Sequence, residues 1–229
     1  MFQVSNKLLY FIGMLFLCSQ SALSQPGSTS SERFYNGIAV GLGVSGINAP
    51  DMIDYLNYNF TPASKLDDFA AAAEFFGSGA FQISSSWGIK VEYAYLIKTY
   101  TIPVQSFPDY NFTSKIHMPT VLAQYIIPGD GFLFKFGVGA GYHIAHFSQD
   151  LYYSNTQYQA HGVGIKLEAE GNTAFDDHLY GYIAMDIRGD FMGDFKDSNK
   201  NSITNRVTGK TVGMNFFTIG LKFGLAYYY

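Results

Sequence analysis

The sequence predicts an all-β fold: a closed, antiparallel, up-and-down transmembrane β-barrel of about eight strands. Three observations carry this prediction. Apolar and polar residues alternate with a period of two through most of the chain, which is the periodicity of strands. Short turns and long loops alternate between these segments. The ionisable residues of the segments share one face, and the opposite, apolar face is the continuous one, as expected for a barrel that faces lipid.

The first half of the chain contains four expected strands. They occupy residues 34–44, 69–83, 87–100 and 116–127. In the first strand, Gly37, Gly41 and Gly43 lie opposite the apolar face, where glycine leaves room for longer side chains from neighbouring strands. The alternation is clearest over residues 87–100.

The long connection after the first strand contains the one helix that we expect. Pro50 and Asp51 favour a short helix that continues through Tyr58. Residues 70–73, four consecutive alanines, are compatible with either a helix or the start of the second strand.

The second half of the chain contains the other four expected strands. They occupy residues 132–147, 161–173, 179–192 and 217–229. The expected tight turns are residues 84–86, 128–131 and 175–178, and the expected long loops are residues 45–68, 101–115, 148–160 and 193–209. Outer-membrane barrels have this asymmetry, with short periplasmic turns and long external loops.

Twelve ionisable residues lie on the inner face of the expected strands, and we predict that they form a charge network in the lumen. They are Glu74, Lys90, Glu92, Lys98, Lys135, Lys166, Glu168, Glu170, Asp186, Arg188, Asp190 and Lys222. Six are basic and six are acidic, so they can pair, whereas unpaired charges in a dry core would each cost several kcal/mol. The network is either a polar path for small solutes or a plug, because eight strands leave a lumen that side chains can fill.

The N-terminus has the features of a secretory signal. Lys7 precedes the apolar run of residues 8–17, and Ala22-Leu23-Ser24 fits a cleavage site, so residues 1–24 are expected to be removed. Cys18, the only cysteine, would leave with them, and Leu17 before it disfavours a lipoprotein signal. Residues 25–33 are expected to form a flexible leader and residues 34–229 the barrel domain.

Composition and hydropathy limit the location of the mature chain. After the signal, no stretch reaches the roughly 18 consecutive apolar residues of a spanning helix, so a membrane-spanning chain would have to be a closed barrel. Acidic residues outnumber basic ones by 18 to 14, and no basic run is present, so we expect no nucleic-acid partner.

The signal peptide, the alternating strands, the glycine-rich first strand and the ending Leu225-Ala226-Tyr227-Tyr228-Tyr229 together resemble a known family. It is the family of small outer-membrane β-barrel proteins typified by OmpX, the membrane domain of OmpA, and OmpW. The resemblance implies location in the outer membrane of a Gram-negative bacterium, contact with outer-membrane lipid, and recognition by the outer-membrane insertion machinery. The terminal apolar face is similar to the family's insertion signal, and its residues are Phe223, Leu225, Tyr227 and Tyr229.

Three further groups of residues are candidates for chemistry. Met52, Tyr55 and Leu56 form a lid or an apolar ligand site if the resemblance extends to OmpW, or simply pack on the rim. His146 and Ser148 resemble the histidine–serine motif of PagL-type lipid A deacylases, but the orienting acid of such a site is missing, and a strand end entering a polar loop is the alternative. Residues 197–201 have the alternating oxygen ligands of a calcium loop but lack its glycine and its distal glutamate.

These observations predict a non-enzymatic integral outer-membrane protein with a structural or surface-interaction role, without cofactor or metal. The alternative is a narrow channel for small or apolar solutes. A lipid A deacylase-like hydrolase is the third hypothesis. The expected partners are membrane lipid, the insertion machinery, and a small solute or an external partner.

Overall fold

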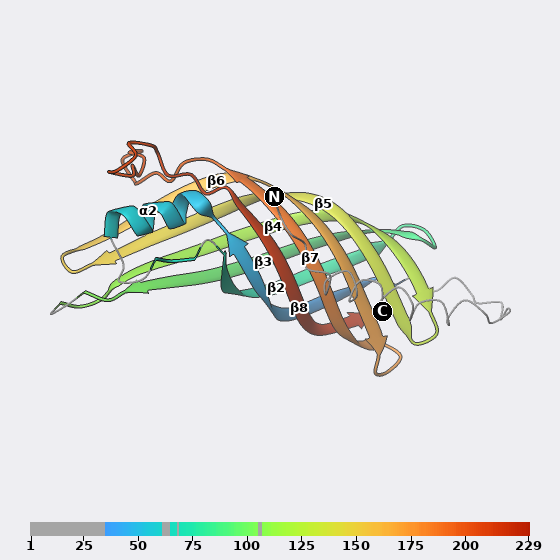
Figure 1. Cartoon of the computed structure of the whole chain (residues 1–229). Helices are drawn as coiled ribbons and strands as arrows, with labels where there is room; N and C mark the ends of the chain where they lie inside the picture. Colours follow the sequence, from blue (N-terminus) through green and yellow to red (C-terminus); the bar gives the residue numbers. More distant parts are fainter. Residues whose placement is uncertain (1–34, 61–64, 68, 105–106) are drawn as a thin grey trace, which may run out of the picture. The chain divides into compact units, whose positions relative to one another are not determined.

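The computed structural model describes residues 35–60, 65–67, 69–104 and 107–229. Within them, eight antiparallel strands form one closed ring, each pairing with its neighbours in sequence and β1 pairing with β8 (Figure 1). The strands are β1 (Gly37–Asn48), β2 (Phe69–Gln82), β3 (Trp87–Ile102), β4 (Tyr110–Gly129), β5 (Phe132–Leu151), β6 (Ser154–Ala174), β7 (Leu179–Met192) and β8 (Phe216–Tyr228). The predicted all-β barrel is confirmed.

Two expected segments lie outside the described residues. They are the signal peptide of residues 1–24 and the leader of residues 25–33, together with Phe34, where the first strand was expected to begin. The helices of the described residues include none that is both long enough and apolar enough to span a bilayer.

The pairing of β1 with β8 closes the ring. Gly41 faces Gly224 across this pair, and a Cβ atom on Gly41 would lie 2.1 Å from the carbonyl oxygen of Phe223 and 2.7 Å from a ring carbon of Phe76. The glycines predicted to make room on the inner face of the first strand do so at this seam, where the two backbones approach closely.

The predicted loops of residues 101–115 and 148–160 are wrong. β4 begins at Tyr110 and β6 at Ser154, so that only residues 103–109 and 152–153 connect the strands of these two hairpins. The ladders continue because inward side chains remain buried beyond the lipid-facing segment, with Phe112 on β4 and Phe147 on β5 among them. The first strand also extends further than expected, to Asn48.

The helix expected after Pro50 is present as α2 (Pro50–Phe60). The alanine run of residues 70–73 is strand and not helix, because it pairs with residues 44–47 of β1. Ladder hydrogen bonds to β1 thus override the helix preference of alanine.

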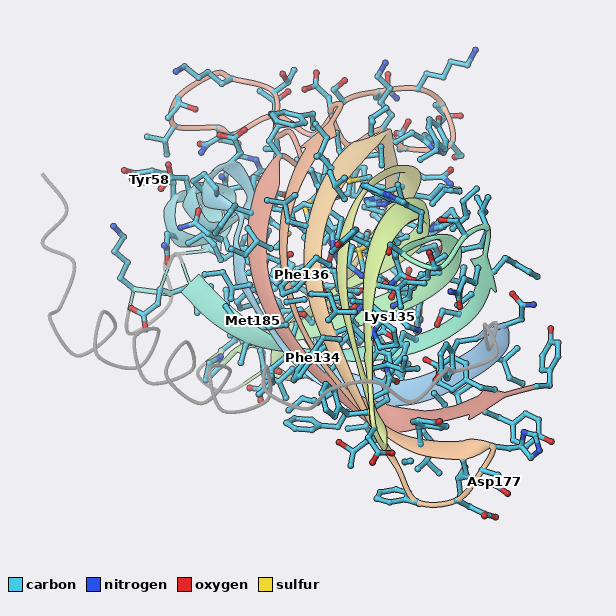
Figure 2. The ribbon with its side chains drawn as sticks, turned by 90° about the vertical axis from the view of Figure 1, so that its right-hand side faces the viewer. Tyr58, Phe134, Lys135, Phe136, Asp177 and Met185 are labelled. Carbon is cyan, nitrogen blue, oxygen red and sulfur yellow. The ribbon has the colours of Figure 1, made fainter. Side chains whose placement is uncertain are left out.

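The outer wall of the barrel is apolar. On five different strands, Leu42, Val91, Val138, Leu167 and Leu221 are each between 43% and 58% exposed. In Figure 2, Phe134 and Phe136 are labelled on β5 on either side of Lys135; the two phenylalanines are exposed, whereas the lysine is buried. An apolar exterior around a charged interior is the arrangement of a transmembrane β-barrel.

The two ends of the barrel differ. The turn end carries residues 83–86, 130–131 and 175–178, and the loop end carries α2 and residues 103–104, 107–109, 152–153 and 193–215. Figure 2 shows Tyr58 of α2 and Asp177 of the last tight turn at opposite ends. Residues 194–213 are held together by isolated β-bridges.

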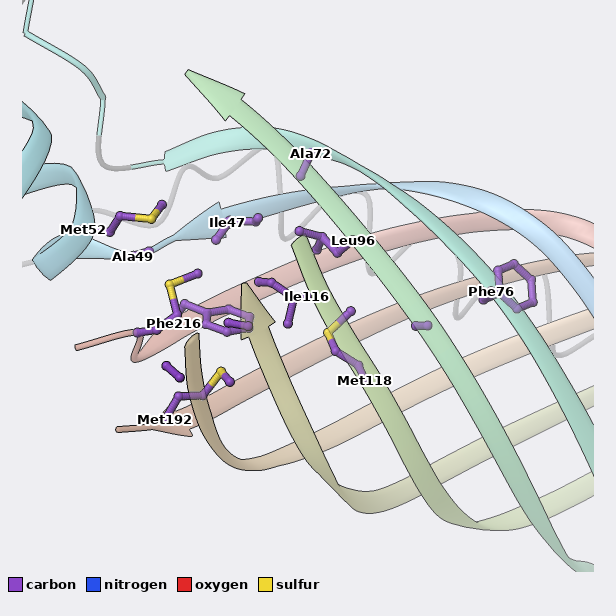
Figure 3. Packing of buried hydrophobic residues seen from close by; sticks show 14 of the residues in the cluster. Ile47, Ala49, Met52, Ala72, Phe76, Leu96, Ile116, Met118, Met192 and Phe216 are labelled. Carbon is purple, nitrogen blue, oxygen red and sulfur yellow. The ribbon is translucent and has the colours of Figure 1, made fainter. Parts of the chain in front are cut away.

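The loop-end half of the lumen is filled by an apolar core. Its residues include Ile47, Met52, Leu96, Ile116, Met118, Met192 and Phe216 (Figure 3). The expected charged inner face is therefore found toward the turn end, and toward the loop end the inner face is mainly apolar. Where the strands rise out of the lipid, their outer face meets water, and burial of apolar side chains inside becomes the favourable arrangement, as in a soluble protein.

Leu221→Lys should lower the free energy of unfolding from lipid vesicles by about 2–4 kcal/mol, because it places a charge on the lipid-facing wall. Tyr153→Lys, at the 89% exposed tip between β5 and β6, is the control and should change stability by less than about 0.5 kcal/mol. Chemical denaturation of the refolded protein measures both values. Equal stability of the two variants would contradict a lipid-facing wall.

Candidate functional site

The lumen holds eleven of the twelve ionisable residues predicted to meet there, each no more than 5% exposed. Lys98 is the exception and the prediction is wrong for it. It is half-buried near the loop end of β3, and its Nζ donates a hydrogen bond to the carbonyl oxygen of Ala71 at 2.8 Å. The apolar core occupies the lumen at that height, so the ammonium group finds its partner on the backbone of β2.

Lys222 lies at the centre of the charge network. Its Nζ is 2.7 Å from a carboxylate oxygen of Glu92 and 3.1 Å from one of Glu74 and one of Asp186. It also lies over the ring of Phe76, 5.1 Å from the centroid. One ammonium group from the closing strand thus holds together carboxylates from β2, β3 and β7.

From Glu92 the network continues toward the turn end as an alternation of cations and anions. Lys166 Nζ lies 2.6 Å from Glu92 and 2.5 Å from Glu168. Lys90 Nζ lies 2.6 Å from Glu168 and 3.0 Å from Glu170. Each of these ammonium groups therefore bridges at least two carboxylates, and each of these carboxylates bridges at least two ammonium groups.

At each of its two ends, the chain of charges meets an uncharged side chain. Toward the turn end, Lys135 Nζ lies 3.0 Å from Glu170 and 2.6 Å from the hydroxyl oxygen of Tyr228. Toward the loop end, Arg188 Nη2 lies 3.0 Å from Glu74, while its Nη1 contacts the sulfur of Met118 at 2.7 Å. Met118 belongs to the apolar core, so the charged and apolar layers meet at this guanidinium group.

A second buried group joins Asp190, which was among the predicted site residues, to His143 and Thr120, which were not. His143 Nδ1 contacts a carboxylate oxygen of Asp190, and its Nε2 lies 3.2 Å from the hydroxyl oxygen of Thr120. The order hydroxyl, imidazole, carboxylate resembles a catalytic triad, but all three side chains are at most 3% exposed, so a substrate has no access to them. The inward alternation of β5 places His143 in the lumen, which is the sequence signal that could have found it.

Glycines make the space for His143. A Cβ atom on Gly164 would lie 2.2 Å from Cε1 of His143 and 2.5 Å from Asp190, and one on Gly141 would lie 2.8 Å from Nε2. This imidazole is therefore packed against bare backbone on its own strand, β5, and on the neighbouring strand β6.

The proposed lid residues Met52, Tyr55 and Leu56 lie on the buried side of α2 and pack into the apolar core. The Tyr55 hydroxyl accepts a hydrogen bond from Gln149 Nε2 at 2.8 Å. Burial raises the pKa of the Tyr55 phenol above its ordinary value, so this hydroxyl is neutral at physiological pH. The helix thus closes the loop end of the lumen by packing.

His146 and Ser148 both face outward on β5, as expected, and line a shallow groove on the outer wall near the loop end. Within the part of the chain that the structure describes, no hydrogen bond joins His146 to Ser148 or to a carboxylate. The nearest acid along the strand, Asp150, accepts a hydrogen bond from Asn155 Nδ2 instead. The geometry of a hydrolase is therefore not assembled.

The possible calcium loop is held by its own hydrogen bonds. Asp197 accepts hydrogen bonds from the backbone N–H of Asn201 at 2.8 Å and of Asn199 at 2.9 Å. The bond from the backbone of Asn201 is the main reason that the pKa of Asp197 lies below its ordinary value. The described residues contain no group of three or more side chains placed to hold a metal ion.

The residues of the expected insertion signal lie on the outer face of β8 or just beyond it. Phe223, Leu225, Tyr227 and Tyr229 are all exposed. Their recognition by the insertion machinery stays a prediction.

The comparisons with known proteins identify the fold. No family model matches the chain, and no curated protein matches it in sequence. Among solved structures, Neisserial surface protein A matches with a TM-score of 0.54 at 14% identity, over 87% of this chain and 98% of that one. OprG from Pseudomonas aeruginosa matches with a TM-score of 0.54 at 14% identity, over 87% and 99%. Ail of Yersinia pestis, solved in complex with a heparin analogue, matches with a TM-score of 0.50 at 10% identity, over 86% and 99%. The chain therefore has the fold of small eight-stranded outer-membrane β-barrels, as the sequence resemblance implied.

Lys222→Met should lower the free energy of unfolding by about 3–5 kcal/mol, because it leaves Glu92, Glu74 and Asp186 without their shared cation. Glu92→Gln alone should also destabilise the barrel. The double variant should lose less free energy of unfolding than the sum of the two single losses, since the two groups contact each other. Chemical denaturation of the four proteins in one detergent gives this cycle, and strict additivity would contradict the coupling.

Gly164→Ala should lower the free energy of unfolding by about 1–3 kcal/mol, because the added methyl group overlaps His143 and Asp190. Gly189→Ala is a matched control: Gly189 is paired with Ile165, the residue next to Gly164, and a Cβ atom there meets no atom within 4 Å. Thermal unfolding in detergent compares the two. A loss of the same size in both variants would show that strand propensity, and not contact with His143, decides the effect.

Proposed function

We propose that this chain is an integral protein of the bacterial outer membrane with a non-enzymatic role, and that it acts through its external surface and not as a pore. The apolar outer wall and the barrel fold support the location. The loop end is external in this proposal, because short turns mark the periplasmic side of such barrels.

The observation that carries the proposal is the filling of the lumen along its length. From the turn end, Tyr180 and Tyr228 are buried in edge-to-face contact, the charge network follows, and the apolar core under α2 closes the loop end. Because every ammonium group in the lumen touches carboxylates, the charged side chains hold one another in place and fill the lumen. This supports the plug over the narrow channel that the sequence left open.

The loop end offers the surface on which an external partner would bind. Its hairpin tips expose aromatic side chains: Tyr153 is 89% exposed, and Tyr152 packs edge-on against Phe107 of the neighbouring hairpin tip. Of the structural matches, one is named as a surface protein and one as an attachment invasion locus protein. These names agree with a surface-interaction role for the present chain, whereas the filled lumen agrees less well with solute transport.

Single cysteines should report this orientation, since the mature chain is expected to contain none. A membrane-impermeant maleimide should label Tyr153→Cys at the loop end in intact cells. It should label Ser85→Cys, exposed at the turn end, only after the outer membrane is permeabilised. Labelling of Ser85→Cys in intact cells would reverse the orientation, and labelling of neither variant in membranes would place the protein elsewhere.

The same protein in planar bilayers separates the surface role from the channel. A filled lumen should give no stepwise single-channel conductance. Regular unitary openings from the wild-type chain would contradict the proposal and favour the channel.

A further inference from the structure

Three neighbouring strands change from apolar to histidine at the loop-end edge of the outer wall. On β4 the outward residues are apolar up to Pro119 and continue with His117 and Lys115. On β5 they are apolar up to Ile144 and continue with His146. On β6 they are apolar up to Val163 and continue with His161. The first polar side chain above the apolar wall is thus an imidazole on each of the three strands, at the height where lipid headgroups begin.

On β6, His161 faces Ile144 across the β5–β6 pair, beside the other two histidines. The side chains on β4 and β5 line a groove. Its volume is about 440 Å³, and it is lined by Tyr95, Lys115, His117, His146 and Ser148, among others. Lys115 and His146 face each other directly across the β4–β5 pair, and the rings of His117 and His146 are 5.5 Å apart, edge to face. Four groups that carry or can take a positive charge are therefore gathered on one patch, which we name the histidine patch: Lys115, His117, His146 and His161.

Tyrosines position the histidines. The Tyr93 hydroxyl lies 2.5 Å from Nδ1 of His117, and the Tyr95 ring packs against the same imidazole with centroids 4.8 Å apart. When Tyr93 donates this hydrogen bond, neutral His117 carries its proton on Nε2 and can donate it to an acceptor. The ring of Tyr142 lies nearly parallel to that of His161, with centroids 6.1 Å apart.

The charges of the groove favour an anion. Its lining includes one acid, Asp150, which lies further toward the hairpin tip, opposite Asn111, and is engaged by Asn155. Gln157, Thr113 and Ser148 add neutral hydrogen-bonding groups. Below the patch, Val121, Val138 and Val163 are each half exposed on the lipid-facing wall. The site thus combines anion-binding groups with an apolar surface directly beneath them.

We propose that the histidine patch binds the phosphate of a lipid headgroup from the outer leaflet, while the acyl chains of that lipid lie along the valines below. This site rests on the proposed membrane location. Lys115 supplies a positive charge, and the imidazoles supply hydrogen-bond donors. A soluble anion would use the patch alone, whereas a lipid uses the patch and the wall together.

Native mass spectrometry of the full chain, folded in detergent micelles and titrated with phosphatidic acid, tests this site. The wild type should retain one phosphatidic acid, and should retain phosphatidylcholine with the same acyl chains less well. Lys115→Gln/His146→Gln should weaken the retention of phosphatidic acid by about tenfold or more, because the charged contact of Lys115 and the hydrogen bond of His146 are both lost. Lys115→Arg should preserve it.

The control is Arg206→Gln/Lys210→Gln, which removes two exposed positive charges at the loop end that line neither the groove nor the pocket beside His161, and it should leave retention unchanged. Equal loss in control and test variants would overturn the site in favour of general charge. Displacement of phosphatidic acid by an equal concentration of inorganic phosphate would assign the patch to a free anion and overturn the lipid.

Folding is checked separately by comparing the gel mobility of heated and unheated samples. A wild-type barrel that shifts on heating but retains no phosphatidic acid would overturn the headgroup site alone. A chain that forms no heat-modifiable barrel would overturn the proposed function and this site with it.

Discussion

Pairing of buried charges is the constraint on which the rest of this barrel depends. Ammonium and carboxylate groups taken out of water are favourable only when each finds an opposite charge at hydrogen-bond distance. The lumen meets this condition with an alternating chain from Arg188 to Lys135, in which Lys222 joins carboxylates of three strands. Because these partners are far apart in sequence, the network also favours one register and one closure of the ring over others.

The barrel changes its physical character along its length. Toward the turn end its outside is apolar and its inside charged, whereas toward the loop end its inside is an apolar core covered by α2. The change follows the solvent outside: lipid requires an apolar wall, and water allows the apolar side chains to move to the interior. Arg188 lies at the boundary, with one nitrogen on Glu74 and the other on Met118.

Because the lumen is filled, the outer surfaces of the barrel are the ones available for binding. The hairpin tips present aromatic side chains to the medium, and the histidine patch presents cationic and hydrogen-bonding groups to the membrane edge. Both surfaces are built on β3 to β6, whose strands extend beyond the apolar wall. The extension of these strands therefore creates the positions from which partners and lipids would be contacted.

The sequence by itself predicted about eight antiparallel strands, and a closed ring because a lipid-exposed sheet edge would leave backbone groups unpaired. The alternation of residues also placed all the predicted lumen charges except Lys98 inside, because period two depends only on the pleat of the strand. It also placed α2, through Pro50 and Asp51. Only the tertiary structure decided which charges touch, since the register across strands joins residues such as Lys222 and Glu92 that no local pattern relates. Likewise, the hairpins predicted as loops, the apolar core and the meeting of three histidines depend on which strands become neighbours when the ring closes.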